Sequence, residues 1–290
     1  MEHIYKLSGM SRQNFAQRYN RYLEKREEMC QLEKLLFDLR EEHPRMGALK
    51  LFDLLNPMHM GREKFQEFYR ELGFTLHEKP NYRRTTNSNG VIRFPNLVDG
   101  LKVTTVNQVW VSDISYYQCH ERLFFLTFIM DLYSRFILGY KASIRLLADH
   151  TTLPTLRMAL RSKNTNNKPI LHSDGGGQYY CKAFLSLARK NVVSSMAKGV
   201  YENAHAERIN GIIKNEYLIP WNPSNFKQLG RLLKKAVYNY NFHRPHRSLN
   251  MKKPADVYQH INSFQQKKKE AKKKSLHLIN HSDKSVNSMQ

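Results

Sequence analysis

The chain has 290 residues, of which 41% are hydrophobic, so it can form one domain of ordinary size and a smaller one. Its formal net charge of +22, from 47 Lys and Arg against 25 Asp and Glu, repels itself unless a polyanion lies nearby. No stretch approaches the roughly 20 apolar residues that span a bilayer, and the N-terminal MEHIYKLSGM lacks the apolar core of a secretion signal. We therefore expect a nucleic-acid partner rather than a membrane.

Three cysteines, Cys30, Cys119 and Cys181, lie far apart and form no CxxC pair. This pattern favours a reducing cytoplasm and argues against a disulfide framework or a structural zinc site. His243 and His246 lie close together in the block HRPH, but no cysteine or acid is near them in the sequence to complete the usual four ligands. We therefore expect a cytoplasmic protein, and no metal at HRPH.

Residues 1–77 are predicted to form a helical DNA-binding region of the helix-turn-helix type. Apolar residues recur at helical spacing in four short segments, namely Phe15, Tyr19 and Tyr22; Met29, Leu32, Leu36 and Leu39; Leu51, Leu54 and Leu55; and Phe65, Phe68, Tyr69 and Leu72. Ser11 is expected to cap the first helix. Arg62 and Lys64 point outward from the fourth, where they can reach phosphates or base edges. A small helical bundle with a solvated charged face is the alternative.

Residues 78–105 are predicted to form a basic linker. Pro80 and Pro95 interrupt regular structure, and no acid lies between Glu78 and Asp99. Arg83 and Arg84 in this segment can follow a DNA backbone, although the segment could equally be an idle tether.

Residues 106–220 show a different pattern, in which strands come first. Three β-rich runs, VNQVWVSDISYY, LFFLTFIMDLY and RFILGYKAS, follow one another with short turns between them. A helix at about 147–162, the run PILHSD, a helix at about 178–190, the run VVSSM and a long helix at about 202–217 come next. This order predicts an α/β fold with a mixed five-stranded sheet and flanking helices, as in a ribonuclease-H-like core.

Residues 221–262 are predicted to form a basic helical extension, which begins with an amphipathic helix at 225–242. Between Glu216 and Asp256 there is no acid, but there are eight basic residues: Lys227, Arg231, Lys234, Lys235, Arg244, Arg247, Lys252 and Lys253. A charged run is usually a solvated face, but eight uncompensated cations favour a phosphate-binding surface. The lysine-rich residues 263–290 are expected to be disordered.

Three acids stand out in this basic chain. Asp113 lies within an apolar strand, where burial requires a partner or a metal. Asp174 ends the fourth strand and is followed by three glycines. Glu207 lies in the first half of the long helix, on the same face as Asn210 and Lys214. Taken singly, they could be an ion-paired strand acid, a turn residue and a surface acid.

Taken together, the three acids predict phosphoryl transfer. Two divalent ions about 3.5–4 Å apart can activate the attacking oxygen and stabilise the leaving oxygen, and Mg²⁺ prefers carboxylate and water ligands. Without metal, close carboxylates repel one another and at least one pKa should rise. Asp131, at the end of the second strand, is expected instead to be a turn residue paired with Arg135.

Several blocks of the sequence resemble one family. VWVSDISYY, IMDLYSRFILGY, LHSDGGGQYY, ENAHAERINGIIKNEYL and NYNFHRPHRSLNMKKPADVY are similar, in this order, to the integrase core of bacterial insertion-sequence transposases of the IS3 type. The likeness covers about residues 105–260. EEHPRMGALKLFDLL also resembles the helix-turn-helix segment that precedes that core.

The resemblance implies a ribonuclease-H-like fold with an Asp-Asp-Glu triad, here Asp113, Asp174 and Glu207, that binds two Mg²⁺ ions, for which Mn²⁺ can substitute. It also implies cleavage at terminal inverted repeats and joining of the freed 3′-hydroxyl to target DNA. Lys214 matches the basic residue that contacts element-end DNA, and Arg208 and Asn210 beside it are expected to contact DNA too.

The same resemblance implies a bacterial, nucleoid-associated protein that forms a homo-oligomer on DNA. A helix-turn-helix or leucine-zipper protein from an upstream reading frame is a further expected partner, because this chain lacks the long zipper segment that the family often encodes there.

The spacing of the acids departs from the family in one interval. Between Asp113 and Asp174 lie 60 residues, as the family pattern predicts, but only 32 lie between Asp174 and Glu207. The shortening falls at MAKGVYENA, before the helix that contains Glu207. The short interval leaves a catalytically decayed DNA-binding regulator as one alternative to an active transposase. A ribonuclease-H-like nuclease with the same fold is the second alternative.

Overall fold

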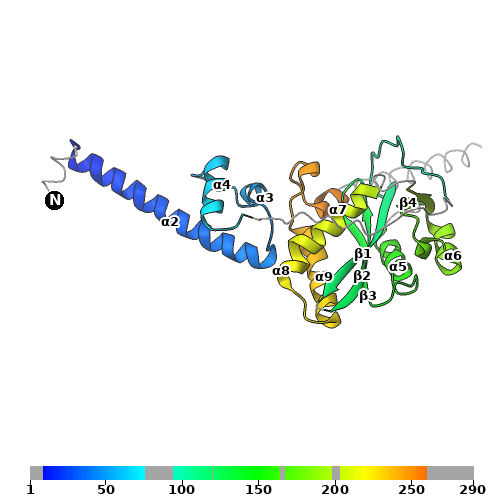
Figure 1. Ribbon diagram of the computed structural model, residues 1–290. Coiled ribbons are helices and arrows are strands. Elements are labelled where there is room, and N and C mark those ends of the chain that lie inside the picture. Colours follow the sequence, from blue (N-terminus) through cyan, green and yellow to red (C-terminus); the bar gives the residue numbers. More distant parts are fainter. Residues whose placement is uncertain (1–8, 76–93, 120, 164–166, 198–202, 260–290) are drawn as a thin grey trace, which may run out of the picture. The chain divides into compact units, whose positions relative to one another are not determined.

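The computed structural model describes residues 9–75, 94–119, 121–163, 167–197 and 203–259 (Figure 1). The chain divides into two compact units, residues Met1–Lys79 and Pro80–Gln290. Within the described ranges, no helix combines the length and the apolar character needed to cross a membrane. Arg83, Arg84 and the tail at 263–290 lie outside these ranges.

The first unit consists of three helices, α2 (Arg12–Glu42), α3 (Ala48–Leu55) and α4 (Arg62–Glu71). Ser11 caps α2 as predicted, because its side-chain oxygen accepts a hydrogen bond from the backbone N–H of Asn14 at 3.2 Å. The prediction of two helices within this range was wrong, since α2 continues unbroken for 31 residues. No glycine or proline lies between its ends, and the polar residues in its middle are good helix formers.

The core of this unit is formed by the C-terminal part of α2 and by α3 and α4. The Tyr69 hydroxyl donates to the carbonyl of Met46 at 3.0 Å and accepts from the guanidinium of Arg40 at 3.0 Å. Gly73, with φ of 71°, follows the C-cap Leu72 of α4 in the left-handed conformation that commonly ends a helix. The remaining core residues are apolar: Leu32, Leu36, Leu51, Phe65, Phe68 and Phe74.

The second unit is built on a five-stranded sheet. Its strands are β1 (Val109–Cys119), β2 (Arg122–Asp131), β3 (Ile137–Ser143), β4 (Ile170–Ser173) and β5 (Val193–Met196). Their spatial order is β3-β2-β1-β4-β5; β1 pairs antiparallel with β2 and parallel with β4. The sequence predicted this mixed sheet, and the three consecutive strands with short turns account for its antiparallel half.

Helices cover both faces of the sheet, as Figure 1 shows. On one face lie α5 (Thr152–Ser162) and α6 (Lys182–Asn191). On the other lie α7 (Ala204–Ile212), the π-helical segment η3 (Ile213–Leu218) and α9 (Phe226–Phe242), with the short α8 (Ile219–Trp221) between them.

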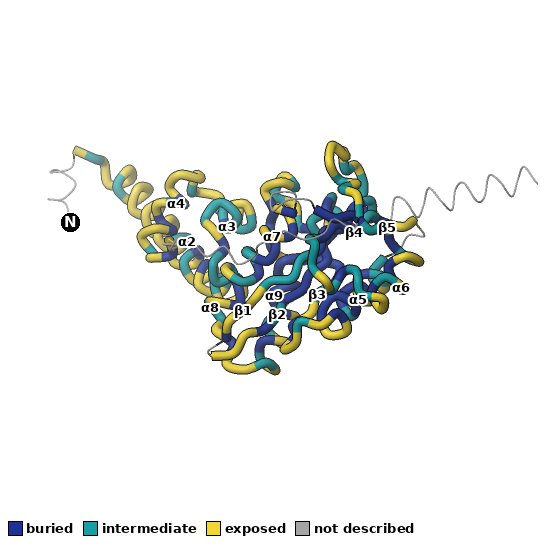
Figure 2. Tube along the Cα trace, turned by 45° about the vertical axis from the view of Figure 1, so that its right-hand side comes forward, coloured by how far each residue is buried: buried dark blue, intermediate teal, exposed yellow. Residues whose placement is uncertain are grey.

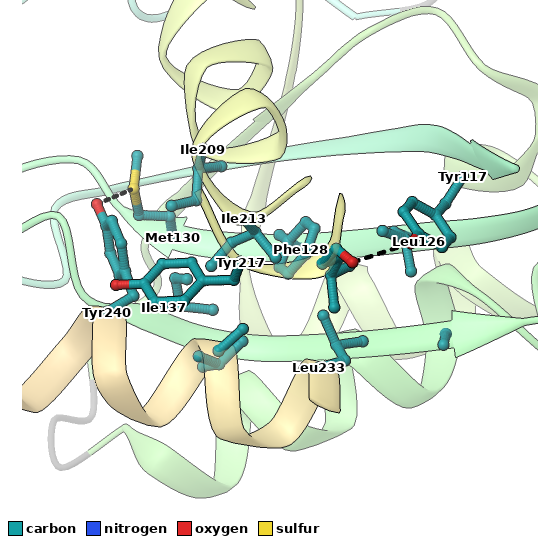
Figure 3. Close-up of a cluster of buried hydrophobic side chains, with 14 of the residues drawn as sticks. Tyr117, Leu126, Phe128, Met130, Ile137, Ile209, Ile213, Tyr217, Leu233 and Tyr240 are labelled. Carbon is teal, nitrogen blue, oxygen red and sulfur yellow. Dashed lines mark hydrogen bonds between the residues drawn. The ribbon is translucent and has the colours of Figure 1, made fainter. Parts of the chain in front are cut away.

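The alternation of side chains along β2 explains these two layers. Phe124, Leu126, Phe128 and Met130 point toward α7 and α9, whereas Ile129 points toward α5. Figure 3 shows the first of these cores, in which Tyr240 of α9 contacts the sulfur of Met130. Buried positions follow the strands, whereas much of α2 is exposed (Figure 2).

Part of the expected linker is packed against the sheet. The backbone N–H of Leu97 donates to the Ser195 hydroxyl at 2.9 Å, and the N–H of Met196 donates to the carbonyl of Pro95 at 3.4 Å. The helix of the expected basic extension, α9, likewise packs its apolar side into the core of the sheet. Both segments are therefore integral to the second unit.

Three predicted helices begin or end at other residues than expected. The helix expected at 147–162 starts at Thr152, and that at 178–190 starts at Lys182 after the Cys181 cap. The long helix expected at 202–217 widens at Ile213 into the π-helical η3. Periodicity in a sequence cannot separate 3.6 from about 4.4 residues per turn over so short a segment.

Gly139 of β3 provides a test of the packing between the sheet and α5. A Cβ at this position would lie 2.3 Å from the backbone oxygen of Thr155, which cannot move without distorting α5. We expect Gly139→Ala to lower the free energy of unfolding by about 2 kcal/mol or more, measured by urea denaturation. Gly230→Ala is the matched control, because nothing lies within 4 Å of its Cβ in α9 and helix propensity should add roughly 0.5–1 kcal/mol. Equal effects of the two changes would contradict this packing.

Candidate active site

The parallel pairing of β1 with β4 places two of the three acids side by side. Ser112 of β1 lies opposite Ser173 of β4, so Asp113 and Asp174, which directly follow them, occupy the next matching positions. Residues at matching positions of neighbouring parallel strands share a face of the sheet. Both carboxyl groups are partly buried.

Two asparagines attach α7 to β1 on either side of Glu207. The Asn203 amide donates to the backbone carbonyl of Ser112 at 3.1 Å, and the Asn210 amide donates to Oδ2 of Asp113 at 2.7 Å. The Ser115 hydroxyl donates to the amide oxygen of Asn210 at 2.9 Å, which fixes its orientation. Glu207 lies one helical turn from each asparagine, so these bonds set its place beside Asp113.

The electrostatics of Asp113 reflect this convergence. The pKa of Asp113 is raised from 3.8 to about 7. Burial is the largest cause, and the negative charges of Asp174 and Glu207 add to it, while hydrogen bonds from the Ile114 backbone and from Asn210 oppose the rise. Burial also raises the pKa of Asp174, although the N–H of Gly176, at 3.2 Å, stabilises its charged form. Asp113 therefore senses both other acids, as the sequence predicted for one member of the set.

The buried Tyr179 lies close to both aspartates. Its hydroxyl lies 2.8 Å from that of Ser112, which donates to the carbonyl of Phe128 at 2.8 Å. Burial, followed by the charges of Asp174 and Asp113, raises the pKa of Tyr179 well above its ordinary value. Tyr179 therefore stays neutral, and it anchors the glycine-rich turn that follows Asp174.

The donor chemistry of this site fits a hard divalent cation, because carboxylate oxygens are the ligands that Mg²⁺ prefers. Asp174 and Glu207 both place negative charge near Asp113, and a cation would neutralise it. As they are arranged here, however, no three His, Cys, Asp or Glu side chains of the described ranges are close enough to hold a metal ion. The three acids are thus in electrostatic contact without forming one coordination sphere.

Lys214 lies on the same side of β1. Its ammonium group donates to the carbonyl of Tyr116 at 3.3 Å, and burial lowers its pKa while the charge of Asp113 opposes that shift. Lys214 is therefore close to Asp113, but its ammonium group also makes a hydrogen bond to the backbone of β1.

Asn210 was expected to contact DNA, but its side chain faces β1 and not solvent. Asn210 is 3% exposed and makes hydrogen bonds to both Asp113 and Ser115. Sequence reasoning missed this role, and that of Asn203, because an asparagine on a helix face gives no sign of whether it meets solvent or a strand. The one signal in the sequence was that Asn203, Glu207 and Asn210 recur at helical spacing and so share a face of the helix.

Asp131 is a turn residue, as predicted, but with other partners. Its fully buried carboxylate accepts from the N–H and the hydroxyl of Ser134, at 2.8 and 2.6 Å, and from the N–H of Asn107 at 2.7 Å. The predicted pairing with the guanidinium of Arg135 was wrong, because Arg135 Nη1 instead lies 3.1 Å from Nδ1 of His205.

Most of the basic residues expected to bind DNA are exposed. On α9, Lys227, Arg231 and Lys234 follow one another at helical spacing on the solvent side, while the Lys235 ammonium lies over the Trp221 ring at 5.1 Å. The other exposed members of the expected set are Arg208 on α7, Arg247 after α9, and Arg62 and Lys64 on α4.

Arg244 is the exception among these basic residues. Its side chain is only 4% exposed, and its guanidinium makes a paired hydrogen bond to Glu216 at 2.7 and 2.6 Å. The expectation that Arg244 contacts phosphate was therefore wrong. Its partner, Glu216, is the last acid before the acid-free segment that ends at Asp256, and the sequence analysis did not identify this pair.

Comparisons with known proteins agree with this architecture. The family model described as integrase core domain matches residues 103–197, and a second model with the same description matches residues 197–254. An insertion element IS600 protein of 31 kDa from Shigella sonnei is 31% identical over 206 residues, covering 69% of this chain and 75% of that protein. The transposase for IS904 of Lactococcus lactis is 27% identical over 183 residues, covering 60% and 71%.

Among solved structures, retroviral integrases have a more distant likeness to the chain. The catalytic core domain of the HTLV-2 integrase in complex with magnesium is 18% identical, with a TM-score of 0.44, and the match covers 54% of this chain and 99% of that one. The simian T-cell lymphotropic virus intasome gives 16% identity, a TM-score of 0.47, and coverage of 76% and 73%.

The mixed sheet and the integrase-core matches together define a ribonuclease-H-like integrase core, preceded by a helical region, as the sequence predicted. The chain belongs to the insertion-sequence transposases of the IS3 type.

The raised pKa of Asp113 predicts how stability depends on pH. Because the folded protein binds a proton at Asp113 up to about pH 7, whereas an unfolded chain releases it near 4, the metal-free protein should lose stability as the pH rises through this interval. Asp113→Asn should remove this loss and be more stable than wild type at pH 8 by about 1–3 kcal/mol. Urea denaturation in EDTA at pH 4 and pH 8 measures both. Asp149→Asn, at an exposed position, controls for net charge, and parallel pH profiles of wild type and Asp113→Asn would contradict the assignment.

The Arg244 pair predicts a loss of stability instead of a loss of DNA affinity. Removing Arg244 leaves Glu216 without its partner, so we expect Arg244→Ala to cost about 3 kcal/mol of unfolding free energy. Arg247→Ala removes the same charge three positions later at an exposed site and should change stability by about 0.5 kcal/mol or less. Chemical denaturation of both variants measures the difference, and similar midpoints would refute the structural role of Arg244.

Proposed function

We propose that this protein is an active transposase, which cleaves the ends of its element and joins the freed 3′-hydroxyl to target DNA at Asp113, Asp174 and Glu207. As a member of its family the protein acts in DNA transposition. The observation that supports the catalytic step is the electrostatic state of Asp113, whose pKa is raised first by burial and then by the charges of Asp174 and Glu207. Such repulsion among acids costs stability, and a catalytic site is the usual reason that it persists.

Asp113, Asp174 and Glu207 would hold the divalent ions, with Mg²⁺ as the natural ion and Mn²⁺ as a substitute. A bound pair of such ions activates the attacking oxygen and stabilises the leaving oxygen of the phosphodiester. Asn210 acts as a positioning residue, because its amide fixes Oδ2 of Asp113 in the charged, ligand-competent form. Asn203 holds the start of α7 against β1.

The cations outside the triad supply the affinity for DNA in this proposal. Lys214 lies beside Asp113 and binds the DNA strand being cleaved, as in the family pattern. The exposed residues Lys227, Arg231 and Lys234 of α9 bind phosphates along one surface. In the first unit, α3 and α4 form a helix-turn-helix pair in which the exposed Arg62 and Lys64 face DNA.

The remaining parts of the proposal concern assembly. Two element ends must be brought together before joining, so we propose that copies of the chain assemble on the terminal inverted repeats. A second polypeptide from an upstream reading frame would help to recognise those repeats, and the assembly would associate with the nucleoid.

Asp174→Asn tests the catalytic assignment. The amide keeps the size of the side chain and can still accept from Gly176, but it removes one anionic ligand, so we expect the rates of cleavage and joining to fall by about 100-fold or more. The substrate is a supercoiled plasmid that carries the DNA flanking the coding region on both sides, incubated with Mg²⁺, Mn²⁺ or EDTA. Asp149→Asn, an exposed aspartate, is the control and should cleave like wild type.

Wild-type rates for Asp174→Asn would overturn the assignment. A wild-type protein that binds the ends but cleaves with neither ion would instead be a decayed regulator. Cleavage of an RNA–DNA hybrid in preference to duplex DNA would identify a nuclease.

A further inference from the structure

The turn between β2 and β3 holds an arginine in an unusual backbone conformation. Arg135 has φ of 63°, in the left-handed region that most side chains avoid. The other described non-glycine residues with positive φ are four asparagines and one methionine: Asn56, Asn107, Asn222, Asn250 and Met251. Asparagine tolerates this region better than arginine does, so the conformation alone does not explain why an arginine is present.

The turn is fixed from inside by Asp131. This buried carboxylate accepts three hydrogen bonds, two from Ser134 and one from the N–H of Asn107, and the carbonyl of Asp131 accepts from the N–H of Arg135 at 2.9 Å. These bonds fix the backbone of the turn and hold Arg135 in a left-handed conformation that an arginine rarely adopts. Strain retained in this way is a recurrent property of binding and catalytic sites.

The Arg135 guanidinium meets two further basic groups on α7. Its Nη1 lies 3.1 Å from Nδ1 of His205, and Arg208, one helical turn later on the same face, is close enough to lower the pKa of both Arg135 and His205. For each of these two groups, burial is the larger cause of the lowered pKa. The cluster therefore holds two guanidinium groups and an imidazole within one small region.

Within the part of the chain that the structure describes, no carboxylate forms a salt bridge with this cluster, although the charge of the buried Asp131 favours the charged form of Arg135. Neither arginine forms a salt bridge there, and the oxygens of the nearby Asp131 are occupied by the turn. Arg208 and His205 are exposed and Arg135 is partly exposed, so an anion in solution can reach all three. Two guanidinium groups that reach solvent and form no salt bridge in the described ranges are available to bind an external anion.

We propose that Arg135, His205 and Arg208 form a binding site for a backbone phosphate of DNA beside Glu207. A planar guanidinium offers paired donors that match two phosphate oxygens, and two guanidinium groups can hold one phosphate from two sides. His205 and Arg208 flank Glu207 in the sequence of α7, so a phosphate held here fixes a DNA strand next to the acids. The inference rests on the proposed function and deepens it, because it names the group that orients DNA at the triad.

The alternative is that Arg135 and His205 merely attach α7 to the β2–β3 turn. That role predicts a change in stability and none in DNA affinity. Arg135→Asn separates the two roles, because asparagine accepts the left-handed backbone while the guanidinium is removed. Arg208→Ala is the second variant, and it changes an exposed residue with no hydrogen bond of its own in the described structure.

The experiment measures the dissociation constant of a fluorescein-labelled 30-base-pair duplex by anisotropy over a series of NaCl concentrations in EDTA. We expect each variant to bind roughly 5- to 10-fold more weakly at low salt, and the log–log salt slope to fall by about 0.9 for each phosphate that is no longer neutralised. Arg157→Ala is the matched control, because Arg157 is an exposed arginine on α5, across the sheet from α7, and its removal changes the net charge equally. Thermal unfolding of each variant checks the fold.

Unchanged affinity and slope in Arg208→Ala, or an equal loss in Arg157→Ala, would overturn the proposal. Because EDTA removes catalysis from this measurement, failure here leaves the triad assignment intact, and failure of the Asp174→Asn test leaves this one intact. A strand-joining assay then distinguishes the source of the phosphate. A rise in the half-saturating concentration of the end duplex assigns it to element-end DNA, and a rise for the target plasmid assigns it to target DNA.

Discussion

The parallel pairing between β1 and β4 is the constraint on which the candidate active site depends. It sets Ser112 opposite Ser173 and so brings Asp113 and Asp174 to matching positions, to which Asn203 and Asn210 attach the helix of Glu207. A slip by one residue would turn Asp113 to the opposite face of the sheet, because side chains alternate along a strand. The register is held from both sides, since β1 also pairs with β2 over ten residue pairs and packs its other face against α5 and α6.

That register gathers like charges, and the fold tolerates them through a small number of hydrogen bonds. Burial and two neighbouring anions disfavour a charged Asp113, while Asn210 and the Ile114 backbone favour it. The resulting pKa of about 7 leaves the group poised between its two states at neutral pH. A divalent cation would shift this balance fully toward the charged form, so binding of the ion and release of a proton would be coupled. The energy stored as repulsion in the metal-free site would then contribute to the affinity for the ion.

The sequence predicted the sheet well because its strands are long, apolar and separated by short turns, as LFFLTFIMDLY shows for β2. It also drew attention to Asp113, which interrupts an apolar strand, and to Asp174, which precedes glycines, and the structure places both at matching positions of neighbouring strands. Their catalytic role stays a prediction. What it could not predict were long-range polar partners. Asn210 and Arg244 have the composition of surface residues, and only the folded chain brings them to Asp113 and Glu216, 97 and 28 positions away. The sequence analysis also divided α2 into two helices, because it followed the change in the apolar pattern and gave less weight to the lack of glycine and proline in this segment.

The distribution of charge in the second unit separates basic residues by role. Arg244 is paired with Glu216, and it joins the segment after α9 to η3 in the interior. The exposed lysines and arginine of α9 have solvent as their neighbour, so their positive field is available to a polyanion at modest cost. Arg135 belongs to neither group, because it is partly buried, forms no salt bridge in the described ranges and has a left-handed backbone conformation. The hydrogen bonds of Asp131 hold this arrangement in the free protein, and a bound anion would stabilise it further. The same logic applies with opposite sign at Asp113. Acidic and basic groups thus lie close together, since Glu207 is flanked on α7 by His205 and Arg208 while Asp113 lies on β1. Such an arrangement would suit the proposed binding of a phosphodiester and its metal ions.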